Sequence, residues 1–394
     1  MNIHNIKLYL RNNIFLQKKI MRFILAFLFC SAALFSQNKL QSGPMVGYCE
    51  MKEAVIWLQT EKPSIVYVAY YAVDNVGEVF KSENYNTTKD NAFTCHVVLD
   101  KLQPGKKYNY EVYLDNKKII LPYETSFSSK KLWQFREKAP DFTVALGSCA
   151  YISEEALDRP GKPYGSNYSI FESIAKKNPD IMIWGGDNIY LREADWDSKT
   201  GIQHRHTHSR KIKEMQALLA KTQNFAIWDD HDFGPNDGDR GFYNKNLTQQ
   251  AFKDFWANKS YGMNPNQNEG IYSCFNWGDA EVFLLDNRFF RSPNDRLTGE
   301  KVLLGASQIQ WLIDALVSSK ASFKMSKFKT YILLLLTVVF TVIPTYALQD
   351  EHHEENDEHA TQEKWGNKLL LSILQPSQKK ITSQHKHTEV ALLG

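Results

Sequence analysis

The stretch NFAIWDDHDFGPND, residues 224–237, joins a short apolar run directly to three acidic residues and a histidine. Carboxylates this close repel one another, so the cluster is unfavourable unless something binds it. Two earlier apolar runs also end in polar residues, FTVALGSC at 142–149 and DIMIWGGD at 180–187. The helical patterns SIFESIAKK and SRKIKEMQALLAKT lie between the three runs. Strands that alternate with helices predict parallel α/β layering from residue 142 onward.

The polar residues at the ends of these three runs point to one shared site. In an open α/β sheet, ligands bind beyond the carboxyl ends of the strands, so we expect Cys149, Asp187 and Asp229–Asp232 to converge. Multivalent cations would remove the repulsion and turn each anion into a ligand. Two metals a few Å apart can bind the oxygens of a phosphate ester and activate water at neutral pH. The pattern therefore predicts metal-dependent phosphoester hydrolysis.

A different pattern precedes this region. Residues 45–127 alternate apolar and polar residues in short runs between Gly, Pro, Asn and Asp turns, which predicts a β-sandwich at 40–130. The stretch LQPGKKYNYEVYL, residues 102–114, is typical of the end of an immunoglobulin-like or fibronectin III-like module. Cys49 and Cys95 lie in this region, and their pairing in an oxidising compartment remains open.

Composition limits the classes of partner. The chain has 394 residues, 43% of them hydrophobic, which is enough for two domains with their own cores. Its 47 Lys and Arg against 44 Asp and Glu give a net charge of +3, and nothing in this balance indicates nucleic-acid binding. We expect a small phosphate ester as the partner.

The N-terminus reads as an export signal. A basic stretch is followed by RFILAFLFCSAALFSQ, an apolar run that ends in small residues, so we expect residues 1–36 to be a signal peptide, with Met21 as an alternative start. The mature protein would then be periplasmic or extracellular. An uncleaved membrane anchor is the alternative, although the run is short for a membrane span.

The motifs in this order resemble the PhoD-like alkaline phosphatases and phosphodiesterases of the calcineurin-like metallophosphoesterase superfamily. The resemblance covers residues 40–323, and its motifs are GSC at 147–149, GGDNIY at 185–190, WDDHDFGPND at 228–237 and SPNDR at 292–296. It implies an immunoglobulin or fibronectin III-like β-sandwich followed by a metallophosphoesterase α/β sandwich. It also implies an enzyme that hydrolyses phosphate mono- or diesters through a metal-bound hydroxide.

The resemblance implies a set of metal ligands. Cys149, Asp187 and Tyr190 would hold Fe3+, with Asp187 bridging toward a second metal. Thiolate, phenolate and carboxylate are anionic donors that suit this ion. The second metal would be Ca2+, an oxygen-seeking ion that fits Asp230 and Asn236.

Catalytic and substrate-binding roles follow from the same resemblance. His231 would act at the leaving oxygen, with Asp229 or Asp232 fixing its tautomer. The substrate phosphate would meet a further set of side chains, namely His208, Arg210 and Arg288. A zinc site in HRHTHSR, residues 204–210, is an alternative interpretation of the same histidines.

The resemblance ends near residue 324. Residue 325 starts MSKFKTYILLLLTVVFTVIPTYA, which has the pattern of another leader, and the later Gly-Asp-x-His type motif is missing. We therefore expect 141–324 to be the N-terminal part of an incomplete phosphatase domain, and 325–394 to be a foreign tail from a fusion or misjoined frame. Two alternatives remain: a catalytically dead remnant that binds metal or phosphate, and a protein tethered to the membrane through the hydrophobic segment 331–348.

Overall fold

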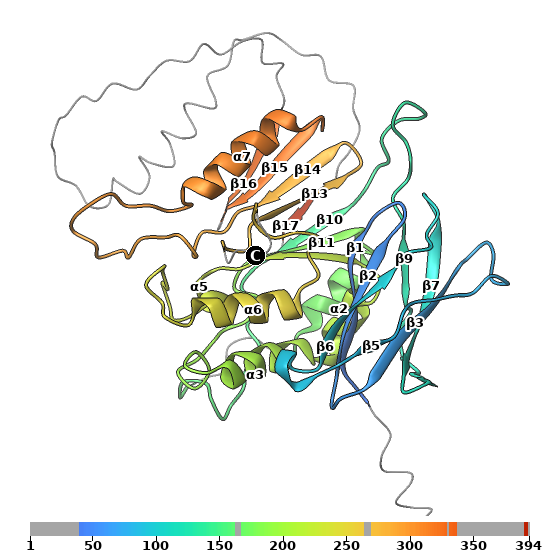
Figure 1. Cartoon of the computed structure of the whole chain (residues 1–394), viewed down its shortest axis with the longest axis horizontal. Helices are drawn as coiled ribbons and strands as arrows, with labels where there is room; N and C mark the ends of the chain where they lie inside the picture. The colour runs from blue at the N-terminus through green and yellow to red at the C-terminus, as the bar shows by residue number, and fades with distance from the viewer. Residues whose placement is uncertain (1–38, 162–166, 264–268, 329–330, 337–389, 393–394) are drawn as a thin grey trace, which may run out of the picture. The chain divides into compact units, whose positions relative to one another are not determined.

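The computed structural model describes residues 39–161, 167–263, 269–328, 331–336 and 390–392 (Figure 1). The expected signal peptide at 1–36 and most of the expected foreign tail lie outside the described residues. Export and the alternative start at Met21 therefore stay predictions.

Two antiparallel sheets form the N-terminal region. The first has the order β1-β2-β6, with bounds Leu40–Cys49, Ala54–Thr60 and Thr94–Leu99. The second has the order β4-β3-β7-β8, with β5 and β9 added at its sides; their bounds are Phe80–Lys81, Ile65–Ala72, Lys107–Leu114, Lys117–Lys118, Tyr85–Asn86 and Ser126–Ser128.

The inward side chains of the two sheets make one hydrophobic core. Alternate residues of β3 and β7 are buried, as the period-2 pattern predicts. Val68 and Tyr110 of the second sheet pack in the same cluster as Ile56 and Val97 of the first. A β-sandwich at this position agrees with the sequence, while its immunoglobulin or fibronectin III class stays a prediction. Cys49 and Cys95 are both buried and free, without a disulfide between them.

The strands of the three apolar runs form a parallel sheet. Its order is β12-β11-β10-β17, with bounds Gln223–Ile227, Ile181–Gly185, Val144–Gly147 and Val390–Leu392. Every residue of β11 and β12 is buried, as expected for parallel strands covered on both faces. The helices of this region are α2, α3, α4, α5 and α6, at Ser169–Lys176, Lys199–Arg210, Lys213–Leu219, Asp230–Phe233 and Lys245–Phe255.

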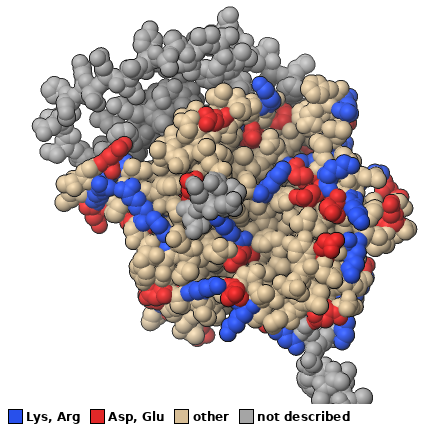
Figure 2. Space-filling model, in the orientation of Figure 1, with Lys and Arg blue, Asp and Glu red and all other residues tan. Residues whose placement is uncertain are grey.

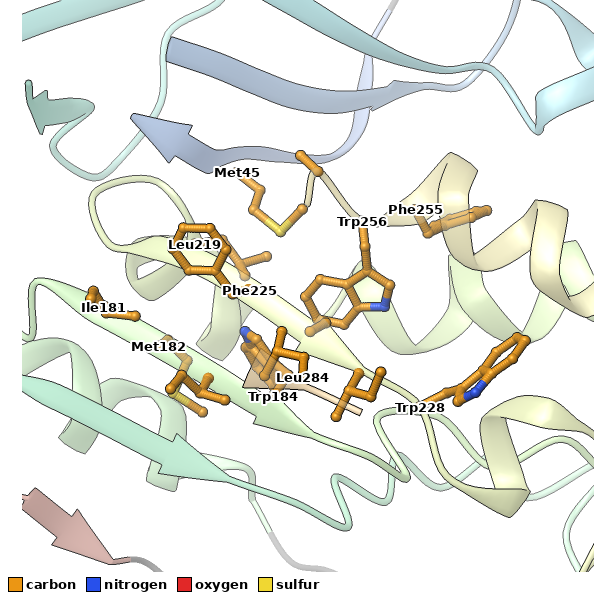
Figure 3. Packing of buried hydrophobic residues seen from close by; sticks show 14 of the residues in the cluster. Met45, Ile181, Met182, Trp184, Leu219, Phe225, Trp228, Phe255, Trp256 and Leu284 are labelled. Carbon is orange, nitrogen blue, oxygen red and sulfur yellow. The ribbon is translucent and has the colours of Figure 1, made fainter. Parts of the chain in front are cut away.

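A second, mixed sheet faces the parallel one. Its order is β13-β14-β15-β16, with bounds Ser273–Trp277, Ala280–Leu284, Phe323–Phe328 and Tyr331–Leu336, and α7 at Ala306–Ser318 connects β14 to β15. Phe225 of β12 and Phe275 of β13 stack at a centroid distance of 3.7 Å across the shared core. Figure 3 shows Trp184, Trp256 and Leu284 in this core.

The pairing of β15 crosses the expected boundary between residues 324 and 325. Met325 pairs in parallel register with Val282 of β14, and the first six residues of the hydrophobic segment 331–348 form β16 beside β15. The rest of that segment lies outside the described residues. Among the residues that the structure describes, no helix is long and apolar enough to cross a membrane.

The sandwich packs directly on the α/β region. Val46 in β1 accepts a hydrogen bond through its backbone oxygen from Asn224 Nδ2 at 3.1 Å. Trp57 Nε1 donates to the backbone oxygen of Asp254 at 2.8 Å. Met45 of the sandwich joins the core of the α/β region (Figure 3). Strand β2 is buried on both faces because one faces the sandwich core and the other faces the α/β region.

Candidate metal centre

Three loops that follow β10, β11 and β12 bring a cysteine and three aspartates together. One carboxylate oxygen from each of Asp187, Asp229 and Asp230 lies within 4.8 Å of the others. Cys149 Sγ lies 3.6 Å from Asp187 Oδ2, to which it donates. The loops expected to converge at the carboxyl ends of the strands therefore do converge.

The backbone of the first two loops is strained where they meet. Cys149 and Asp187 have φ values of 59° and 51°, in the left-handed region that non-glycine residues rarely adopt. Cys149 N donates to Gly186 O at 3.1 Å, and Ala150 N donates to Asp187 O at 2.8 Å. These bonds hold both residues in conformations that cost free energy in isolation, a feature that is common at functional sites.

Gly186 permits the third loop to approach. It has a φ of 106°, and a Cβ at this position would lie 2.8 Å from Asp229 Cβ and 3.1 Å from Asp229 N. A side chain here would collide with the third loop, so glycine is required for the contact between the loops after β11 and β12.

Asp232 fastens the same two loops together. It is 1% exposed, its Oδ1 accepts from Asn188 N at 3.0 Å, and its Oδ2 accepts from Asp229 N at 3.0 Å. We expected Asp229 or Asp232 to fix the tautomer of His231. Instead, Asp232 bonds to the backbone of both loops, because the short helix α5 turns its side chain inward.

A second buried carboxylate, Asp286, was missed by the sequence analysis. Its Oδ1 accepts from Trp228 Nε1 at 2.7 Å and from the backbone amides of Arg288 and Phe289, at 2.9 and 3.0 Å. Its Oδ2 accepts from Ile271 N at 2.9 Å. The only signal in the sequence is the polar triplet DNR that follows β14. Asp286 shapes the turn that carries Arg288 toward the acidic cluster.

Arg288 is fully buried and bonds to the carboxylates themselves. Its Nε donates to Asp229 Oδ1 at 2.6 Å, and its Nη2 donates to Asp230 Oδ1 at 3.1 Å. Its Nη1 donates to Gly238 O at 3.3 Å. We expected Arg288 to meet the substrate phosphate, but its guanidinium is engaged by the protein because the turn after β14 directs it inward.

The carboxylates differ in electrostatic environment. Burial, followed by the charges of Asp230 and Asp229, raises the pKa of Asp187 to about 6. Burial also acts to raise the pKa of Asp230, but the Asp237 amide and the Arg288 guanidinium outweigh it and lower that pKa. Asp187 thus carries the unfavourable negative charge of the cluster.

Tyr190 and His231 both lie beside Asp187. Their rings are 4.4 Å apart, and His231 N donates to Asp187 Oδ1 at 3.3 Å. Burial, then the charge of Asp187 and a hydrogen bond with Cys149, raises the pKa of Tyr190 above its usual range. Burial lowers the pKa of His231 despite the nearby Asp230, so its imidazole is neutral at pH 7.

Three other expected site residues are not brought to the cluster. Asn236 is exposed and its Nδ2 donates to Asp237 Oδ2. The Nε2 of His208 lies 3.0 Å from the backbone oxygen of Ser153. Arg210 is buried under the sandwich, where its guanidinium lies 3.8 Å from the Trp256 ring, because the C-terminal end of α3 faces this interface.

The expected zinc alternative also finds no support in the described part of the chain. The run HRHTHSR is helical as part of α3, and His204 Nε2 bonds to Glu154 Oε1 at 2.8 Å. Within the described ranges, the one group of three potential ligands with mutually close donor atoms is the aspartate cluster.

Two protein-family models match parts of this chain. A family model described as PhoD-like phosphatase matches residues 142–336, the region that holds all three loops and the strands of both sheets except β17. The chain carries a PhoD-like phosphatase domain. The match continues past residue 324 and ends where β16 ends. A second model, a domain of unknown function (DUF7800), matches residues 37–132 in front of the phosphatase domain.

A solved structure agrees with the fold of this chain. A structure titled "Structure of PhoD" superposes with a TM-score of 0.60 at 19% sequence identity, covering 74% of this chain and 62% of the other. The chain therefore spans about 62% of the length of that protein. A purple acid phosphatase, PPD1 from yellow lupin (Lupinus luteus) seeds, matches with a TM-score of 0.48 at 12% identity, covering 71% and 49% of the two chains. None of the curated proteins matches the sequence.

Proposed function

We propose that the chain is an exported, metal-dependent alkaline phosphatase or phosphodiesterase that hydrolyses small phosphate esters. The observation that carries this proposal is the convergence of Asp187, Asp229 and Asp230 to within 4.8 Å at the strand ends of the PhoD-like domain. Export is supported by the leader pattern of residues 1–36. On the face shown in Figure 2, acidic and basic side chains are interspersed, which favours a small substrate over nucleic acid.

The loops after β10 and β11 fit a metal ion. Cys149, Asp187 and Tyr190 offer thiolate, carboxylate and phenolate donors beside one another, which is a donor set for iron, and we propose Fe3+ here. The raised pKa of Asp187 indicates a carboxylate without a compensating charge, which a cation would supply. A metal bound here would contribute Lewis-acid charge and lower the pKa of a water molecule.

The expected calcium half is arranged differently. Asp230 gives Oδ1 to Arg288, and its Oδ2 accepts from Asp237 N at 2.8 Å. Asn236 is exposed and bonds to the neighbouring side chain. The Ca2+ pair of Asp230 and Asn236 is therefore not part of the proposal, because both carboxylate oxygens of Asp230 accept hydrogen bonds within the protein.

His231 is the proposed catalytic side chain. Its half-buried imidazole lies against the Tyr190 ring at an interplanar angle of 32°, and its backbone amide donates to Asp187 at 3.3 Å, so the ring is held at the edge of the centre. A neutral imidazole N–H can donate a hydrogen bond to the leaving oxygen of the ester as negative charge develops there.

A chromogenic phosphate mono- and diester assay tests the proposal. The full chain is produced with iron and calcium and compared with Asp187→Ala and Asp90→Ala. Asp90 is a matched control because its side chain is 98% exposed. We expect Asp187→Ala to lower kcat/KM by about 100-fold or more, while Asp90→Ala stays at the wild-type rate. Equal rates for all three proteins would contradict the proposal.

A catalytically silent metal-binding remnant is the second candidate. The observation in its favour is that Arg288 already engages two of the three carboxylates. Elemental analysis together with the same assay separates the candidates: bound iron without turnover supports the remnant, and bound metal with turnover supports the enzyme.

A further inference from the structure

Arg288 divides the carboxylate cluster into two unequal halves. On one side, Asp229 Oδ1 accepts from Arg288 Nε at 2.6 Å and from Asn287 Nδ2 at 3.0 Å. On the same side, Asp230 Oδ1 accepts from Arg288 Nη2 at 3.1 Å, and Asp230 Oδ2 accepts from Asp237 N at 2.8 Å. Both aspartates therefore have a cation and a second donor.

The other half lacks a cation. The Asp187 side chain accepts from the Cys149 thiol at 3.6 Å and from the His231 amide at 3.3 Å, and both distances are longer than the usual hydrogen bonds to a carboxylate. Within the described residues, no basic side chain pairs with it. The open coordination positions of the cluster thus lie on the side of Asp187, toward Cys149.

Arg288 is fixed in its position. It is 0% exposed, its backbone N donates to Asp286 Oδ1 at 2.9 Å, and its Nη1 donates to Gly238 O at 3.3 Å. A guanidinium stays charged at any physiological pH, and removing it would leave two buried carboxylates uncompensated. The three carboxylates together carry three negative charges, of which Arg288 balances one.

We infer that this centre binds a single metal ion beside Asp187 and Cys149, and that Arg288 supplies the second positive charge of the site. The inference rests on the proposed function in taking the aspartate cluster as a metal site. A planar guanidinium that bridges Asp229 and Asp230 occupies the positions where a second cation would bind both.

Metal counting tests the inference without reference to turnover. The full chain is loaded with Fe3+ and Ca2+, dialysed, and measured by elemental analysis. We expect one iron per chain and no retained calcium. Two tightly held metals per wild-type chain would overturn the inference.

Substitution of the guanidinium gives an independent test. We expect Arg288→Met to gain one Ca2+ per chain in isothermal titration, because Asp229 and Asp230 lose their cation, while Arg288→Lys keeps a positive charge and gains none. Circular dichroism checks that each variant is folded. Asp230→Asn provides a second test if Arg288→Met does not fold: it should retain one iron, and a loss of iron would contradict the inference.

The outcomes separate this inference from the proposed function. A chain that hydrolyses phosphate esters and holds two metals overturns the single-metal inference and leaves the function standing. A chain that holds one iron and hydrolyses neither mono- nor diesters overturns the function and leaves the single-metal inference standing.

Discussion

The aspartates around the centre form two groups that use the same side chain differently. Asp232 and Asp286, which we call the framing aspartates, are 1% and 0% exposed, and every one of their oxygens accepts from an N–H group at 3.0 Å or less. The side chain of Asp187, the open aspartate, accepts only two hydrogen bonds from the part of the chain that the structure describes, and both are long, at 3.3 and 3.6 Å. The difference shows that the supply of N–H donors decides whether a carboxylate holds the loops or remains available to a ligand.

The comparison predicts opposite effects on stability. Removing a framing aspartate leaves buried N–H donors without an acceptor, so it should destabilise the chain. Removing the charge of the open aspartate relieves repulsion, so it should stabilise the metal-free chain. Four substitutions test this contrast, and their free energies of unfolding are compared in metal-free protein.

The largest effect is expected from Asp286→Ala. Four N–H donors, from Trp228, Ile271, Arg288 and Phe289, would lose their acceptor. A buried donor without a partner costs about 1–3 kcal/mol. Taking the lower value for each of the four donors, we expect a loss of about 4 kcal/mol in the free energy of unfolding. Urea unfolding measures it, with exposed Asp90→Ala as the control. A loss of unfolding free energy no greater than that of the control would show that Asp286 does not stabilise the fold.

Asp232→Asn should have the next largest effect. The carboxamide places an NH2 group against one of the two backbone amides, from Asn188 or Asp229, that the carboxylate now binds. We expect a loss of about 2 kcal/mol in unfolding free energy and a 10- to 100-fold weaker affinity for iron. Urea unfolding and competition with a chelator measure the two effects. Wild-type values in both would show that Asp232 does not frame the site.

Asp187→Asn should act in the opposite direction and depend on pH. The folded pKa of Asp187, about 6, lies above its unfolded value near 3.8, so the native state binds more protons between these values and stability falls as pH rises. Asparagine removes this loss. We expect the metal-free variant to exceed the wild type by roughly 1–3 kcal/mol at pH 8 and to equal it below pH 4. A variant less stable than wild type at pH 8 would contradict the claim that the charge of Asp187 destabilises the metal-free chain.

Cys149→Ser should have the smallest effect on the fold. The side chain is exposed, and serine keeps the same backbone substituent at a residue of positive φ. We expect unfolding free energy within about 0.5 kcal/mol of wild type. Iron affinity should nevertheless fall, because a hydroxyl is a poorer ligand than a thiolate. Unchanged iron affinity would show that Cys149 is not an iron ligand and would leave Asp187 and Tyr190 as the proposed ligands.

The convergence of the strand-end loops was predictable from the sequence because it depends on local signals. Apolar runs such as NFAIW define buried parallel strands, and such strands end on one rim whatever their loops do. The positions of Cys149, Asp187 and Asp230 were predicted in this way, and each lies in the first residues after its strand. The β-sandwich was equally visible, because alternation along β3 and β7 matches the pleat of a half-buried sheet.

Tertiary structure decided the partners of each charge. The sequence predicts that Arg210 binds the substrate, yet its guanidinium lies between Trp57 of the sandwich and Trp256 at the end of α6. Arg288 meets Asp229 across 59 positions of sequence, and Asp286 binds Trp228 across 58.

The sequence by itself thus determined which strands form and which loops carry acidic residues, because hydrophobic periodicity and strand ends are local properties of the chain. Only the tertiary structure decided which aspartates hold the loops and which one stays open. That choice depends on N–H donors and a guanidinium brought from distant segments, and their positions follow from packing rather than from spacing.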